Sequence, residues 1–409
     1  MSLAEIDLLD LGHYALAPPH ALWKRLRAEA PVHWQPERDG GAGFWSITRH
    51  ADVKHVSRSP QLFSSTRGTN LFDPDPETLA ILQGIMINMD PPRHTEYRTL
   101  LKGGFSPRRV ARFEGFARRT AREIVDAVAP RGECDFVEEV AALLPMATIC
   151  EAFGIPESDR RHCYDLANRL IAADDPEVLG EESSEGVLAE TFAYATRLAA
   201  HKRAHPGDDL ATRLVQGSVD GKPVDDMVFG TYVIMMIVAG NETTRTVTTN
   251  GMLRLIEHPD QRRAVVEDRS LLPNAIEEML RFDPAVHHFR RTATRDTEIR
   301  GTTIRAGQKL ALWYGSANRD EEVFPDPDRF DVRRANARDH LAFGVGQHFC
   351  LGANLARLQL RVIFEEVLER IPEMELRAAP RRLRSNFING VKEMRVSFPP
   401  APALGERAA

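Results

Sequence analysis

A lone cysteine on a glycine-rich loop constrains this chain more than any other feature. Cys350 ends the run Phe-Gly-Val-Gly-Gln-His-Phe-Cys, and a helical pattern begins at Ala353. Glycines let a loop turn tightly and lie flat against a planar ligand, and the free amides of a helix N-terminus favour a charged sulfur. His348 can donate a hydrogen bond to an acid on the same ligand. The pattern therefore indicates a metal-bound thiolate, as in a haem iron with a cysteine axial ligand.

Two other interpretations of this loop fit less well. A buried structural cysteine is the ordinary role of a single cysteine, but it does not require the surrounding glycines and histidine. A dinucleotide-binding loop would begin like Gly344-Val345-Gly346, yet Phe349 stands where the third glycine belongs. The acids that follow, Glu365 and Glu366, lie in a helical pattern where that loop would need a second strand.

The loop resembles the haem-binding signature of the cytochrome P450 superfamily, Phe-Gly-x-Gly-x-His-x-Cys-x-Gly, and matches it at every fixed position. The resemblance extends from about Trp45 to Val396. It implies haem b, with Cys350 as the iron ligand and with Phe343, His348 and Gly352 beside the cofactor. It also implies a mainly α protein with a small β lobe, a triangular helical domain that encloses the haem. We expect one domain over residues 1–409, with irregular or loosely packed ends at about 1–20 and 400–409.

Composition excludes several other classes of protein. The mild net charge of -6 does not indicate a nucleic-acid-binding protein. The four cysteines form no Cys-x-x-Cys pair, so neither a disulfide framework nor a zinc cluster is indicated. Acidic residues interrupt the N-terminus, and no run of about 18 apolar residues occurs. We therefore expect a cytoplasmic protein without a membrane anchor.

A long apolar helix is expected from about Asp225 to Leu255, and short strands are expected at Trp45–Thr48 and over 298–313, with a turn at Gly301. The helix carries Ala239 and Gly240, followed by Glu242 and Thr243 in its otherwise apolar interior. In the superfamily the corresponding stretch lies over the haem.

The resemblance gives the polar residues of this helix a catalytic role. Thr243 would hold dioxygen and a water molecule, and Glu242 would relay protons from solvent. The alternative for Glu242 is an ion pair with Arg245, which stands three residues later on the same helix face.

Other matches imply haem-binding and structural residues. Glu278 and Arg281 match the superfamily's Glu-x-x-Arg pair, which Arg329 would join in a structural network. The residues expected to bind the haem propionates are His94, Arg98, Arg291 and His348. Strand alternation would direct Arg290 away from the haem, and Arg93 is expected to be exposed.

The substrate pocket is expected to be apolar because the segments that match the superfamily's variable regions are apolar. Its predicted members are Leu71, Phe72, Ile85, Met86, Ile171, Val238, Val286, His287, Phe387 and Ile388. His287 and His288 either orient a polar group of the substrate or pack in the core.

The sequence therefore predicts a haem-thiolate monooxygenase that hydroxylates a hydrophobic small molecule with O2 and electrons from NAD(P)H. Short segments are similar to bacterial members that oxidise steroids, terpenoids and methyl-branched lipids. The resemblance implies a monomer that receives electrons from a ferredoxin and a ferredoxin reductase. The ferredoxin would dock on a basic face formed by Arg108, Arg109, Arg112, Arg333, Arg334 and Arg338. The alternative is that these arginines are ordinary solvated side chains. Alternatives are a peroxygenase, a C–C coupling enzyme, a desaturase or a non-catalytic haem sensor.

Overall fold

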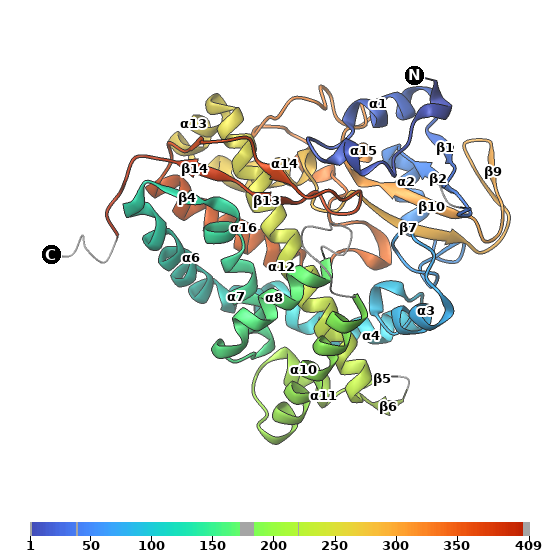
Figure 1. Ribbon diagram of the computed structural model, residues 1–409, viewed down its shortest axis with the longest axis horizontal. Coiled ribbons are helices and arrows are strands. Elements are labelled where there is room, and N and C mark those ends of the chain that lie inside the picture. Colours follow the sequence, from blue (N-terminus) through green and yellow to red (C-terminus); the bar gives the residue numbers. More distant parts are fainter. Residues whose placement is uncertain (1, 38–39, 172–183, 220, 404–409) are drawn as a thin grey trace.

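The computed structural model describes residues 2–37, 40–171, 184–219 and 221–403. It is mainly helical, with the strands gathered in small sheets, as the sequence predicts (Figure 1). The longer helices are α1 (His20–Glu29), α2 (His50–Arg58), α3 (Pro76–Leu82), α4 (Arg93–Lys102), α6 (Glu114–Val128), α7 (Leu143–Phe153), α8 (Arg160–Ile171), α10 (Ser184–Ala204), α11 (Leu210–Val215), α12 (Asp226–Glu257), α13 (Pro259–Glu267), α14 (Leu272–Phe282) and α16 (Ala353–Arg370). Two single turns are α5 (Pro107–Val110) and α15 (Tyr314–Ala317).

The largest sheet joins distant parts of the chain in the order β1-β2-β10-β7-β3. Strand β10 pairs with β2 in parallel and with β7 in antiparallel fashion. Its strands are β1 (Val32–Gln35), β2 (Phe44–Ile47), β3 (Phe63–Ser64), β7 (His288–Ala293) and β10 (Lys309–Trp313). The smaller sheets contain β4 (Glu133–Asp135), β5 (Ser218–Val219), β6 (Lys222–Pro223), β8 (Thr297–Ile299), β9 (Thr302–Ile304), β11 (Glu375–Leu376), β12 (Arg381–Arg382), β13 (Val391–Glu393) and β14 (Arg395–Ser397).

Helix α12 runs through the middle of the molecule and contacts α7, α8 and α10 (Figure 1). Asp225 caps its first turn by accepting a hydrogen bond from the Val228 amide at 2.8 Å. The helix has 32 residues and is buried along most of its length, so the expected apolar helix is confirmed. The main core surrounds it and draws residues from Met86 to Phe398. Within the described ranges, no helix is long and apolar enough to cross a membrane.

The N-terminal segment packs more tightly than we expected from its sequence. Ile6, Leu8 and Tyr14 are 1%, 0% and 2% exposed, and they pack in one cluster with Trp23 and Trp313. The described part of residues 1–20 is irregular, as expected, because it contains only two short 3-10 turns before α1, but it is not loosely packed. These residues share the cluster with Phe44 of β2 and Trp313 of β10, so the segment buries apolar surface against the sheet.

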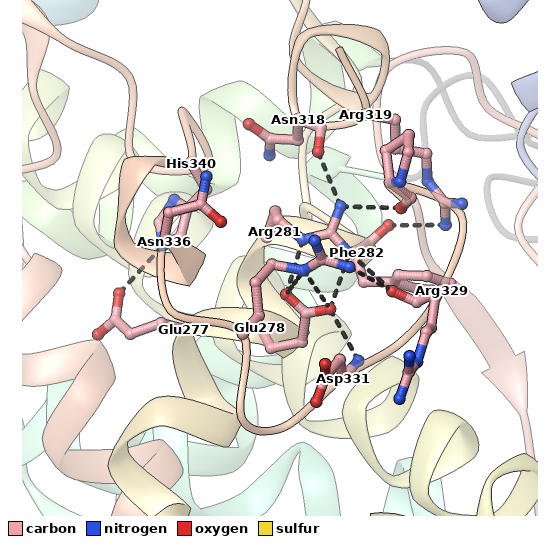
Figure 2. Close-up of polar contacts among 12 residues, drawn as sticks. Glu277, Glu278, Arg281, Phe282, Asn318, Arg319, Arg329, Asp331, Asn336 and His340 are labelled. Carbon is pink, nitrogen blue, oxygen red and sulfur yellow. Dashed lines mark hydrogen bonds and ion pairs between the residues drawn. The ribbon is translucent and has the colours of Figure 1, made fainter. Parts of the chain in front are cut away.

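A buried ionic network fixes the chain that leads to the cysteine loop (Figure 2). On α14, Glu278 accepts hydrogen bonds from Arg281 at 2.6 and 2.8 Å, as the sequence predicts. The third cation differs from the prediction: Arg334 donates to both Glu278 oxygens at 3.1 Å. Arg329 contributes its backbone carbonyl, which accepts from Arg281 at 3.3 Å and from Arg334 at 2.8 Å. Its side chain is exposed, so a network role for the Arg329 guanidinium was wrong.

This network predicts a clear difference between two arginine variants. Arg334→Ala should destabilise the protein by roughly 3–5 kcal/mol, because it leaves the buried Glu278 charge without one partner. Arg329→Ala keeps the carbonyl and should change the free energy of unfolding very little. Urea unfolding of the haem-loaded proteins at equal haem occupancy measures both. An equal loss in the free energy of unfolding for the two variants would contradict the assignment of Arg334, and not Arg329, as the cation that binds Glu278.

Candidate active site

The backbone of the cysteine loop adopts the turns that its glycines predict. Gly344 and Gly346 have φ of 66° and 79°, a region that favours glycine. A Cβ on Gly346 would lie 2.8 Å from the Ser57 carbonyl oxygen, so a side chain there would displace α2. The Cys350 amide donates to the Phe343 carbonyl at 2.8 Å, which closes the loop. Gly352 differs from these two glycines, because it has an ordinary φ of -87° and starts α16.

The Cys350 thiol lies at the wall of a large cavity between this loop and α12. Burial raises the pKa of the thiol, and the Gly352 amide, Arg98 and Arg357 act in the opposite direction. Without a metal ion at the site, the Cys350 thiol would therefore stay protonated near neutral pH. A metal ion at the site would deprotonate it, since a coordinating thiol loses its proton to the metal.

The cavity is cationic at one side and contains no acidic side chain among its described lining residues. Arg291 is buried and donates only to the neighbouring Arg290 carbonyl, at 2.7 Å. Arg98 donates to the Phe349 carbonyl at 2.6 Å. Neither guanidinium has a carboxylate partner within the described chain. A buried unpaired cation such as Arg291 is costly, and the half-buried Arg98 lines the same cavity, so this side of the cavity fits an anionic ligand such as the two propionates of haem.

Two histidines line the same side of the cavity as these arginines. The rings of His94 and His348 lie 4.3 Å apart, and His94 Nδ1 is buried without a hydrogen-bond partner. Burial and then Arg98 lower the pKa of His94 to about 4. Burial and then Arg291 lower the pKa of His348 to about 2. Both imidazoles are therefore neutral. His348 already contacts the Ser65 hydroxyl through Nε2 at 3.3 Å and hydrogen-bonds the Met89 backbone, whereas His94 Nδ1 is available for a hydrogen bond to an acid of the cofactor.

Helix α12 forms the opposite wall of the cavity through Ala239, Gly240, Thr243 and Thr244. The Thr243 hydroxyl donates to the Ala239 carbonyl one turn earlier, at 2.7 Å. That bond leaves the Thr243 oxygen free to accept a hydrogen bond from the cavity. A Cβ on Gly240 would lie 3.0 Å from the Ile149 side chain, so the glycine allows α7 to approach α12 closely.

Glu242 occupies a different face of the same helix. Its carboxylate is 1% exposed, forms an ion pair with Arg245 and accepts from the Thr246 hydroxyl at 3.1 Å. Arg245 in turn donates to Asn168 on α8 at 2.9 Å. Burial raises the pKa of Glu242, and Arg245 opposes that effect. Glu242 does not line the cavity. The structure contains its ion pair with Arg245, which the sequence left open as the alternative to a proton relay.

The substrate residues predicted from sequence separate into several groups. Only Met86 and Val286 line this cavity. Leu71, Phe72 and Phe387 line a second cavity, on the other side of the sheet edge. The remaining described candidates line neither cavity: Ile85, Val238, His287 and Ile388. The Ile171 side chain lies outside the described part of the chain.

Tertiary packing explains why several of these residues lie away from the first cavity. His287 packs against Tyr14 at 5.2 Å and Trp23 at 5.6 Å between ring centres, because the N-terminal segment covers it. Sequence reasoning also missed cavity residues on elements far from any motif, namely Ser57, Ile149 and Tyr314. No local signal marks these three positions, since only the tertiary packing brings them to the cavity.

The residue next to Glu278 positions the cysteine loop from the other side. Glu277 accepts from Arg357 at 2.6 and 2.9 Å and contacts His340 Nε2 at 3.1 Å. The Arg357 guanidinium lies 4.5 Å from the centre of the Phe343 ring, so it links Glu277 to the start of the loop. Burial would raise the pKa of Glu277, but the His340 and Arg357 hydrogen bonds lower it to about 2.

This pKa predicts a pH-dependent contribution to stability. Because the folded pKa of about 2 lies below the ordinary value of 4.5, ionised Glu277 stabilises the fold above pH 4.5. The contribution should disappear as the pH falls from 4.5 towards 2. The free energy of unfolding lost in Glu277→Gln should therefore shrink over that range, measured by urea unfolding at pH 6, 4.5 and 3. The exposed Glu369→Gln is the control. If the free energy of unfolding lost in Glu277→Gln did not vary with pH, stabilisation by an ionised Glu277 would be ruled out.

Comparisons with known proteins agree with this site. A family model described as "Cytochrome P450" matches residues 195–374. The steroid C26-monooxygenase of Rhodococcus jostii (strain RHA1) is 38% identical, over 96% of this chain and 84% of its own. The linalool 8-monooxygenase of Pseudomonas putida is 39% identical, over 96% and 99%. The methyl-branched lipid omega-hydroxylase of Mycobacterium tuberculosis (strain ATCC 25618 / H37Rv) is 39% identical, over 97% and 95%.

A solved structure is similar along almost the whole chain. The Mycobacterium marinum cytochrome P450 in complex with pseudoionone aligns with a TM-score of 0.90 and 37% identity, over 96% of this chain and 98% of its own. The fold of this chain and its similarity to these proteins therefore agree with the prediction made from the cysteine loop. The chain belongs to the cytochrome P450 family, the haem b monooxygenases.

Proposed function

We propose that this monooxygenase hydroxylates an apolar small molecule of the terpenoid, steroid or branched-lipid class. The observation that carries the proposal is the wall of the cavity around Thr243, where the neighbouring side chains are hydrocarbon or thioether. They include Ile149, Met235, Val247, Val286 and Phe289. A substrate held against these side chains meets no charged group. This wall therefore suits an apolar molecule whose reacting group is an unactivated C–H bond. The names of the three relatives point to the same substrate classes.

Haem bound through a cysteine thiolate supplies the activation of O2 that this oxidation needs. The chain's own residues do the remaining work. Arg98, Arg291 and the two histidines would hold the propionates, and Cys350 would hold the iron. The apolar wall excludes water from the reacting bond. Thr243 would hold a water molecule or a proton at its hydroxyl oxygen, beside the substrate.

In this proposal Glu242 supplies protons only after its ion pair with Arg245 has opened. Its carboxylate is engaged by Arg245, which is itself held by Asn168 on α8. A proton can pass from Glu242 to Thr243 only when that ion pair opens, since the carboxylate does not line the cavity. The raised pKa of Glu242, caused by burial, would help it to carry a proton once it is released from Arg245.

Electrons would come from a ferredoxin and its reductase, on the side of the molecule behind Cys350. The structure narrows the set of candidate docking arginines. Arg334 is buried against Glu278, so it is removed from the predicted basic face. Arg108, Arg333 and Arg338 are exposed. Arg109 and Arg112 both pair with Asp208. A cytoplasmic monomer with this docking face remains part of the proposal.

The role of Thr243 predicts a change in how electrons are used. Thr243→Ala removes the hydroxyl, so proton delivery should fail and electrons should be diverted to peroxide. Product formed per NADPH should fall by roughly tenfold or more, while hydrogen peroxide rises. The assay uses a spinach-type ferredoxin, its reductase and a terpenoid or steroid selected by its spin-state shift.

The matched control for this experiment is Thr248→Ala. Thr248 makes the same kind of bond to a carbonyl four residues earlier, at 2.8 Å, but it lies outside the cavity lining. It should keep the coupling of the parent protein. Unchanged product yield in Thr243→Ala would remove Thr243 from the mechanism.

A further inference from the structure

A buried tyrosine lies at the same side of the haem cavity as Arg291. Tyr314 follows strand β10 directly and is the first residue of the single turn α15. It lines the cavity together with Arg291, although it is only 4% exposed. No sequence motif includes Tyr314, and the residues known to bind haem by resemblance do not account for it. Its hydroxyl is therefore a polar group of the cavity wall without an assigned role.

Strand alternation places Tyr314 and Arg291 on the same face of the sheet. Phe289 and Arg291 stand two residues apart on β7, and both line the cavity. The Tyr314 and Phe289 rings meet edge to face, with 6.0 Å between their centres. Arg290 lies outside the cavity lining and pairs with Asp73 at 2.8 Å, so its predicted outward direction is confirmed. The Tyr314 ring thus packs on the face of β7 that carries Arg291.

The surrounding structure fixes the position of the Tyr314 ring. Its amide donates to the His287 carbonyl at 2.8 Å, which extends the pairing of β10 with β7. Its carbonyl accepts from the Asn318 amide at 2.9 Å. Val53 and Val56 of α2 belong to the same buried cluster as Tyr314, and α2 packs against α15. The direction of the hydroxyl therefore follows from the fold, not from a mobile side chain.

Two groups of the cavity wall lie close to the Tyr314 hydroxyl. Burial raises the pKa of the phenol, and Arg291 and then Ser57 oppose that effect. Both of these residues line the cavity, so the hydroxyl lies at the cavity wall. Ser57 does not reach Tyr314 with normal hydrogen-bond geometry, and no described carbonyl or carboxylate accepts the phenol proton. The phenol is protonated at neutral pH and is a donor without an acceptor.

Arg291 leaves donors free toward the same space. Only one bond of its guanidinium has an acceptor in the described chain, the Arg290 carbonyl at 2.7 Å. A guanidinium has no acceptor atom, so Arg291 cannot take the phenol proton of Tyr314. A carboxylate has two oxygens and can accept from both groups at once. The pair of Arg291 and Tyr314 therefore suits one carboxylate of the cofactor better than either residue does alone.

We propose that the Tyr314 hydroxyl donates a hydrogen bond to the haem propionate that Arg291 binds. Tyr314 is then a haem-binding residue that contributes a neutral donor beside a charged one. This role rests on the proposed binding of a propionate by Arg291. A donor at the propionate reduces the negative charge that the haem iron experiences, so Tyr314 also makes the iron easier to reduce.

The test uses the haem-loaded protein and the variant Tyr314→Phe, which removes the hydroxyl and keeps the ring. Loss of a hydrogen bond to a charged acceptor should speed haem transfer to excess apomyoglobin roughly tenfold. The reduction potential of the iron should become more negative, because the propionate regains negative charge. The propionate bending band in the resonance Raman spectrum should shift to lower frequency.

The matched control for lost stability is Tyr14→Phe. Tyr14 is also a buried phenol, but it donates to the Leu8 carbonyl at 3.0 Å and lies outside the cavity lining. Its substitution should lower the free energy of unfolding and leave haem release, the reduction potential and the Raman band unchanged. Equal changes in Tyr14→Phe and Tyr314→Phe would overturn the proposal, because they would reflect stability alone.

A second variant, Arg291→Lys, tests the propionate assignment on which the role of Tyr314 rests. Changed haem release and a shifted Raman band in Arg291→Lys, with neither in Tyr314→Phe, would reject Tyr314 alone. No change in either variant would reject the binding of a propionate at this side of the cavity. A change in Tyr314→Phe but not in Arg291→Lys would contradict a shared propionate. None of these measurements needs substrate or turnover, so each outcome is separate from a failure of the proposed hydroxylation.

Discussion

Two adjacent buried acids on α14 hold the cysteine loop in place. Glu278 binds Arg281 and Arg334 and fixes the chain before the loop (Figure 2). Glu277 binds His340 and Arg357, which lie on either side of the loop. The position of the Cys350 sulfur therefore depends on a helix that itself contributes little to the cavity. Buried ion pairs fix geometry more reliably than they add stability, which suits a loop that must present one atom to a metal.

The cationic side of the cavity shows the other requirement of the fold. Arg291 and Arg98 donate to backbone carbonyls and have no carboxylate partner in the described chain, and the described lining of the cavity contains no acid. A protein that kept this arrangement without an anionic cofactor would carry the cost of desolvated charge. The haem propionates would remove that cost, so cofactor binding and stability of this region should be linked.

The family resemblance predicted the fold class, and the apolar run predicted the long buried helix. The motif residues Cys350, His94, Arg98 and Arg291 line one cavity, as the resemblance implies. Sequence reasoning failed where side-chain direction depends on packing. Arg329 and Arg334 are both arginines of one irregular segment, and only the fold shows which one reaches Glu278. Phe387 and Leu71 are apolar, as predicted, but they lie on the far side of β7. The sequence alone did not decide whether Glu242 pairs with Arg245, because i,i+3 spacing permits this contact without requiring it.

The central claim is that Cys350 ligates a haem iron as a thiolate. The most direct test is the carbon monoxide difference spectrum of the dithionite-reduced protein, recorded for the parent and for Cys350→His. The account predicts a strongly red-shifted Soret band in the parent that is absent in the variant. An imidazole-type spectrum in the parent, or a protein that binds no haem, would contradict the claim and every role that depends on it.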